Sequence, residues 1–98
     1  MFKVVENVSK KINNGRTPDK VFYQVVEEVG ELSKEVRAKY DQNYYKKEGE
    51  DGILGESCDI LISLLDFLIL QGFTEQQVIE TINKKCNKWN NKINNIGV

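Results

Sequence analysis

Residues 56–70, Glu-Ser-Cys-Asp-Ile-Leu-Ile-Ser-Leu-Leu-Asp-Phe-Leu-Ile-Leu, decide the fold of this chain. Successive residues of an α-helix are rotated by about 100°, so the apolar side chains of this stretch would cover most of the helix surface. A helix that is apolar nearly all round is a buried helix. Its main polar residues recur at i, i+3, i+7 and i+10, and they are Glu56, Asp59, Ser63 and Asp66. Because an unpaired buried charge is very costly, we expect these carboxylates to meet a cation or another partner.

A second group of acids lies upstream, within a helix expected at residues 18–40. It consists of Glu27, Glu28, Glu31 and Glu35. Glu28, Glu31 and Glu35 fall on one strip along the edge of the apolar face, and Glu27 lies farther round. Two acid-striped helices that face each other would form a site for a hard divalent cation, and ligands that are all oxygen favour Mg²⁺ or Mn²⁺ over zinc. The alternative for the upstream group is a solvated helix face with i, i+4 pairs to lysine.

Apolar periodicity predicts four helices and therefore an all-α protein. The expected helices cover residues 2–13, 18–40, 53–71 and 74 onward, with a frayed tail at 94–98. Residues 41–52 are polar and contain glycine, and we interpret them as a loop that could act as a lid.

Signals at the helix ends support these boundaries. The sequence Asn13-Asn14-Gly15 interrupts the first apolar pattern. Thr17-Pro18 is a typical helix start, and Gly72 is a typical residue after a helix end. Thr74 and Gln77 have the spacing of a capping box.

Composition limits the function classes. A chain of 98 residues with 40% hydrophobic residues suggests one domain, residues 1–98, and small helical bundles often bury more surface as dimers. A net charge of -1 argues against binding to a nucleic-acid polymer through bulk electrostatics. The chain has no histidine, which excludes Ser-His and Cys-His nucleophilic mechanisms. Any chemistry would rest on carboxylates, lysines, hydroxyls and metal ions.

The sequence also predicts a cytoplasmic protein without a membrane segment. Residues 1–6 lack the apolar region of a signal peptide, and the longest apolar stretch, residues 60–70, is far shorter than the ~20 residues that span a bilayer. Cys58 and Cys86 are expected to be buried free thiols in a reducing compartment.

The last helix carries an apolar strip beside a basic strip of Lys85, Lys88 and Lys92. Lys85 and Lys88 could contact phosphate oxygens, although a solvated face is the alternative. We expect Trp89 in the core rather than stacked on a base.

Three further polar side chains are open to interpretation. Tyr44 and Tyr45 in the loop are the better candidates for stacking on a base. Asp66 is expected to bond a tyrosine or a lysine, within the bundle or across a subunit interface, or to support a metal site from a distance.

The stretch Glu27-Glu28-Val29-Gly30-Glu31-Leu32, followed at a distance by Glu56-Ser57-Cys58-Asp59, resembles the MazG-like family of all-α nucleoside triphosphate pyrophosphohydrolases. The family motif is EExxE followed by ExxD, and the resemblance covers residues 17–90. It implies a four-helix MazG-like bundle that is completed by dimerisation, as a homodimer or a dimer of dimers.

The resemblance also implies residue roles. Mg²⁺, or Mn²⁺, would be bound by Glu28, Glu31, Glu56 and Asp59. Glu27 would be an auxiliary acid that orders a metal-bound water, so that Glu27, Glu28 and Glu31 form the catalytic set. Substrate contacts would come from Gln24, Asn83, Lys85 and Lys88. Lys88 stands where the family more often has arginine, which would provide a bidentate phosphate contact.

The implied reaction cleaves a nucleoside triphosphate between its α and β phosphates, giving the monophosphate and pyrophosphate. Two alternatives remain open. The first is a related all-α enzyme acting on phosphoribosyl-ATP or dUTP. The second is a non-catalytic helical dimer, in which the acids form interhelical salt bridges and the protein acts as an interaction module.

Overall fold

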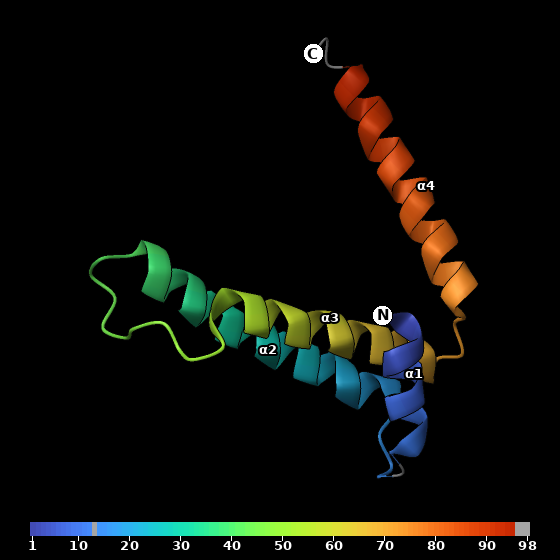
Figure 1. The fold of residues 1–98 in the computed structure, drawn as a ribbon, viewed down its shortest axis with the longest axis horizontal. Coiled ribbons are helices and arrows are strands. Elements are labelled where there is room, and N and C mark those ends of the chain that lie inside the picture. Colours follow the sequence, from blue (N-terminus) through green and yellow to red (C-terminus); the bar gives the residue numbers. More distant parts are fainter. Residues whose placement is uncertain (13, 96–98) are drawn as a thin grey trace.

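A computed structural model describes residues 1–12 and 14–95 of the chain. This described part is all-helical and contains no strand, which confirms the predicted fold class. Its helices are α1 (Phe2–Lys11), α2 (Pro18–Tyr40), α3 (Gly52–Leu70) and α4 (Glu75–Asn94) (Figure 1). The predicted boundaries agree within two residues. The break predicted at Asn13-Asn14-Gly15 is confirmed at Asn14 and Gly15, which belong to no helix, while Asn13 and residues 96–98 of the tail predicted at 94–98 lie outside the described residues.

The ends of α3 and α4 form as the sequence predicted. Gly72 has a φ of 89°, and its N–H donates to the carbonyl of Ile69 at 3.0 Å. The N–H of Phe73 donates to the carbonyl of Leu68 at 3.2 Å, so the backbone turns back on the last turn of α3. Thr74 then starts α4 with both hydrogen bonds of a capping box to Gln77.

Helices α2 and α3 form an antiparallel hairpin. The rings of Phe22 and Phe67 lie 5.5 Å apart near one end, and the Glu28 and Ser63 side chains are hydrogen-bonded farther along. Later residues of α2 therefore lie beside earlier residues of α3, as in an antiparallel pair. Val21 and Val25 of α2 are buried. This hairpin places the two acid-bearing segments side by side.

Helix α1 packs on the C-terminal half of α3. Phe2 and Val5 form the core cluster with Leu65, and Ile69 and Val78 pack against it. Because α1 carries Phe2, Val5 and Ser9 at helical spacing, these three side chains face α3 together.

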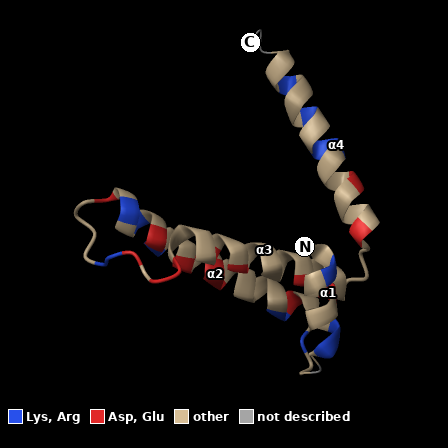
Figure 2. Cartoon of the chain, viewed as in Figure 1, with Lys and Arg blue, Asp and Glu red and all other residues tan. Residues whose placement is uncertain are grey.

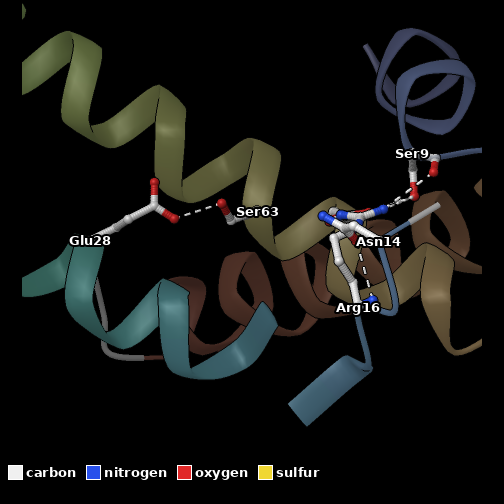
Figure 3. A network of polar contacts seen from close by, with 6 residues as sticks. Ser9, Asn14, Arg16, Glu28 and Ser63 are labelled. Carbon is white, nitrogen blue, oxygen red and sulfur yellow. Dashed lines mark hydrogen bonds and ion pairs between the residues drawn. The ribbon is translucent and has the colours of Figure 1, made fainter. Parts of the chain in front are cut away.

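A polar network joins the same two helices (Figure 3). Asp66 of α3 accepts a 2.6 Å hydrogen bond from the Ser9 hydroxyl and forms an ion pair with Arg16, just before α2. Arg16 also donates to the Ser9 carbonyl at 3.2 Å. The prediction of a tyrosine or lysine partner for Asp66 is therefore wrong. The buried carboxylate of Asp66 requires a positively charged partner, and Arg16, in the connection between α1 and α2, provides it.

Helix α4 extends away from the other three helices (Figure 1). The radius of gyration is 16.9 Å, compared with about 13 Å for a compact domain of about 100 residues. The four-helix bundle is therefore not closed within one chain, and its completion by a second chain stays a prediction.

Several burial predictions are wrong for the single chain, for the same physical reason. Helix α3 was expected to be buried all round, but only Leu65 and Asp66 are buried. Trp89 is 67% exposed, and both Cys58 and Cys86 are exposed free thiols. Each of these side chains lies on a helix face that no other helix of the same chain covers.

Candidate acidic site between α2 and α3

Glu28 is held between the two helices of the hairpin. Its Oε1 accepts a 2.6 Å hydrogen bond from the hydroxyl of Ser63, and both side chains are half-buried (Figure 3). Glu28 lies on the edge of α2 that faces α3, because Val21 and Val25, at the same helical spacing, form the buried contact. The acid strip of α2 therefore borders the α2–α3 interface, as the sequence predicted.

Glu56, on α3, lies in a negative environment. Partial burial raises the pKa of Glu56 above its ordinary value of 4.5, and neighbouring negative charges raise it further. Those charges belong, in decreasing order of effect, to Asp59, Asp51, Glu31 and Glu35. The hairpin thus brings acids from α2, α3 and the preceding loop into electrostatic contact.

The remaining acids of α2 differ in their partners. Glu31 is exposed and pairs with Lys34 at 3.4 Å on the same helix. Both carboxylate oxygens of Glu35 accept the N–H of Gly49, at 3.0 and 2.9 Å, which ties the loop to α2. A Cβ at position 49 would lie 2.6 Å from Glu35 Oε1, so glycine permits this close approach.

Glu27 and Gln24 are exposed on α2, and Asp59 is exposed on α3. Within residues 1–12 and 14–95, no three acidic, cysteine or histidine side chains stand in an arrangement that could hold a metal ion. The acids are neighbours, but in this conformation their oxygens are directed to Ser63, Lys34 and Gly49 rather than to one common point.

The predicted substrate contacts on α4 lie apart from the acids. Asn83, Lys85 and Lys88 are exposed on a helix that diverges from the hairpin. Figure 2 shows the lysines along α4 and the acids concentrated on α2 and α3. A single chain therefore places these acids along the same hairpin, with Glu31, Glu56 and Asp59 in electrostatic contact, but it does not bring Asn83, Lys85 and Lys88 to them.

The loop between α2 and α3 carries a stack of side chains. The Arg37 guanidinium lies 4.3 Å from the centre of the Tyr44 ring, and the Tyr44 and Tyr45 rings are 5.0 Å apart. Tyr45 is 80% exposed. The loop at residues 41–51 is confirmed, and Tyr45 presents an aromatic face to solvent at the hairpin end that holds Glu35.

Sequence reasoning gave no role to three residues that organise the structure. Ser63 was recognised as part of the polar strip, and its position seven residues after Glu56 was the signal for a contact to an opposing helix. Asp51 and Arg16 lie outside the helices that carry the motif. Arg16 had one usable signal, a lone cation beside a helix start.

No family model, curated protein or solved structure matches the chain. Among the described residues, no helix combines the length and apolar character needed to cross a bilayer.

Proposed function

We propose that the protein is a Mg²⁺-dependent nucleoside triphosphate pyrophosphohydrolase that releases pyrophosphate and a nucleoside monophosphate from an NTP or dNTP. The observation that carries the proposal is the pairing of two acid strips across the α2–α3 hairpin. Glu28 of α2 accepts a hydrogen bond from Ser63 of α3. The negative charges of Glu31 and Glu35 on α2 contribute to the raised pKa of Glu56 on α3.

The donor set supports a hard cation. Glu28, Glu31, Glu56 and Asp59 offer carboxylate oxygens alone, which suits Mg²⁺ or Mn²⁺. Mutual repulsion among acids, as at Glu56, is relieved when a cation binds. When bound, the metal would neutralise polyphosphate charge and polarise the attacking water.

The surrounding residues would each have a distinct task. The Ser63 hydroxyl holds one oxygen of Glu28 and thereby limits its rotation. Exposed Glu27, adjacent in sequence, would orient water and accept its proton. Hydrolysis of a phosphoanhydride depends on charge neutralisation and an oriented water more than on a protein nucleophile, so a chain without histidine can perform it.

Substrate contacts would come from Gln24 on α2 and from Asn83, Lys85 and Lys88 on α4. These α4 residues reach an acid strip only if α4 packs against a hairpin, which favours assembly as a homodimer or a dimer of dimers. We also propose a cytoplasmic location, where the exposed thiols of Cys58 and Cys86 remain reduced. A nucleic-acid polymer and a membrane are not among the proposed partners.

Two other functions have support. A related all-α enzyme acting on phosphoribosyl-ATP or dUTP would use the same acids, because its reaction also breaks a phosphoanhydride bond. A non-catalytic helical dimer is supported by the exposed apolar face of α4. It would use the acids for salt bridges alone.

A substrate panel separates these functions. Pyrophosphate release would be measured from canonical and modified NTPs and dNTPs, including dUTP, and from phosphoribosyl-ATP, with Mg²⁺ and with EDTA. The proposal predicts release that requires the metal and is greatest for one group of nucleoside triphosphates. Release from phosphoribosyl-ATP or dUTP alone would favour the related enzyme. No release from any of them, by folded protein, would favour the interaction module.

A further inference from the structure

Helix α4 carries an apolar strip that the described part of its own chain leaves exposed. Its residues are spaced alternately by three and four, as in a coiled-coil seam, and are Ile79, Ile82, Cys86, Trp89 and Ile93. All of them are exposed, and Trp89 is 67% exposed. The helix also contains several asparagines, which have low helix propensity. A helix of this kind is marginal in water unless its apolar face packs against a partner.

Helix α3 presents a matching strip on the side opposite α2. Leu54, Cys58 and Leu61 follow the same spacing of four and three, and Leu54 is 76% exposed. Leu61 is rotated by about 200° from Ser63, which contacts α2. Nearer the α4 end, an open apolar groove of about 580 Å³ lies between α3 and the start of α4, and it is lined by Leu61, Leu64 and Leu68 of α3 and by Val78 and Ile82 of α4.

Within the described part of one chain, the two strips meet only at this groove, where Leu61 and Ile82 both contribute to the lining, and α4 then diverges from α3 (Figure 1). The N–H groups of Gly72 and Phe73 are bonded back to α3, and Thr74 caps α4 through Gln77. All four connecting residues, 71–74, therefore take part in hydrogen bonds. Folding α4 back on its own α3 would require a different backbone conformation at residues 71–74.

The exposed surface has the size of a dimer interface. The chain exposes 7846 Å², whereas a compact protein of this mass exposes about 5,700 Å². If each chain buried this excess of roughly 2,000 Å², the interface would total about 4,000 Å², which lies in the range of obligate homodimers.

Charges on the two helices are complementary. Helix α3 has acids and no basic residue, whereas α4 beyond Glu80 has four lysines and no acid. Asp59 follows Cys58 of the α3 strip, and Lys85 precedes Cys86 of the α4 strip. The α3 strip is thus flanked by a negative charge and the α4 strip by a positive charge. Helix α3 of a second copy therefore offers α4 both an apolar strip to pack against and negative charges that complement its lysines.

We propose that α4 of each chain packs on the Leu54–Cys58–Leu61 strip of α3 in a second copy, in a reciprocal two-fold exchange. The exchange buries the strips of both chains and brings Lys85 of one chain beside Asp59 of the other. It rests on the homodimer proposed above and not on the proposed hydrolysis. The contact of Lys85 with substrate would then be made between chains.

The two cysteines of the chain test this exchange directly, because they lie at the centres of the two strips. Cys58→Ser and Cys86→Ser proteins are refolded together from urea and treated with a short thiol-specific bismaleimide. Each variant alone lacks one member of the expected pair. The exchange predicts a covalent dimer in the mixture and in the wild type, and little dimer in either variant alone.

Every other pattern overturns the proposal. Cross-linking within one wild-type chain, with none in the mixture, would show that α4 folds back on its own α3. A dimer from Cys58→Ser alone would show that α4 pairs with α4. Absence of cross-linking, or a monomer by light scattering, would show that a second copy does not cover α4.

A matched pair of α4 variants distinguishes cross-linking that depends on packing of the α4 strip from cross-linking by random collision of two chains. Ile82→Asp places a charge in the strip and should reduce cross-linking at least tenfold. Asn91→Asp places the same charge on the opposite side of α4 and should leave cross-linking unchanged. Equal effects of the two variants would contradict the proposal. Because these readouts do not use a nucleotide, their failure is separate from failure of the hydrolase proposal.

Discussion

The hydroxyl of Ser63 on α3 donates a 2.6 Å hydrogen bond to Oε1 of Glu28 on α2. The bond joins the two acid-bearing helices (Figure 3). It also fixes one oxygen of a carboxylate that we propose as a metal ligand. Ser63 therefore has both a structural and a positioning role.

Ser63→Ala should lower the free energy of unfolding by about 1–2 kcal/mol, because a half-buried carboxylate loses a hydrogen-bond donor. If Glu28 binds the metal, the variant should also weaken Mn²⁺ binding roughly tenfold through loss of ligand orientation. Urea unfolding and Mn²⁺ titration measure the two effects. Ser33→Ala, at an exposed position of α2, is the matched control. Unchanged stability in Ser63→Ala would contradict the structural role.

Glu56→Gln should raise the melting temperature at pH 7 in buffer with EDTA. The raised pKa of Glu56 means that its ionised form is less favourable in the folded than in the unfolded state. This cost is fully present above the raised pKa and disappears as the pH falls below 4.5, where Glu56 becomes protonated in both states. The advantage of the glutamine variant should therefore shrink between neutral pH and pH 4.5.

The measurement is the difference in melting temperature between Glu56→Gln and the wild type across this pH range. Glu50→Gln, in the exposed loop, controls for removing a charge from an acidic protein. With Mn²⁺ present, the order of stabilities should reverse, because the wild type gains more from the bound cation. A glutamine variant that is less stable than wild type in EDTA would show that Glu56 is not repelled by its neighbours.

Arg16→Ala should destabilise the protein by about 3 kcal/mol, because it leaves the carboxylate of Asp66 without its cation. Asp66→Asn should recover part of this loss in the double variant, since the amide can still bond Ser9 without carrying a charge. A double-mutant cycle by urea unfolding gives the coupling energy. Lys11→Ala removes a nearby exposed cation and should have little effect. No coupling between Arg16 and Asp66 would contradict the ion pair.

The helices and their ends followed from local sequence signals. Pro18 at the start of α2, Gly72 after α3 and the Thr74–Gln77 capping box each act within a few residues, so periodicity and capping rules locate them. The pairing of the acid strips of α2 and α3 also followed from position at the edge of an apolar face, and it places Glu56 near Glu31 and Glu35.

Burial and side-chain partners did not follow from local signals. The apolar character of α3 predicts burial but does not say which chain provides the cover, and Leu54 and Trp89 remain exposed in a single copy. The partner of Asp66 depends on how the connection after α1 folds, which brings Arg16 and Ser9 to it from outside the motif. The position of Lys85 relative to the acids depends on the direction of α4, and therefore on assembly.

Pyrophosphate release by the wild type and Asp59→Asn, each with Mg²⁺ and with EDTA, tests the proposed activity most directly. Asp59 is exposed and the substitution changes little volume, so the variant should fold. Glu80→Gln, an equally conservative change on α4, is the matched control. The account predicts Mg²⁺-dependent release by the wild type and by Glu80→Gln, and a loss of at least a hundredfold in Asp59→Asn. Equal release by Asp59→Asn, or release that continues in EDTA, would contradict it.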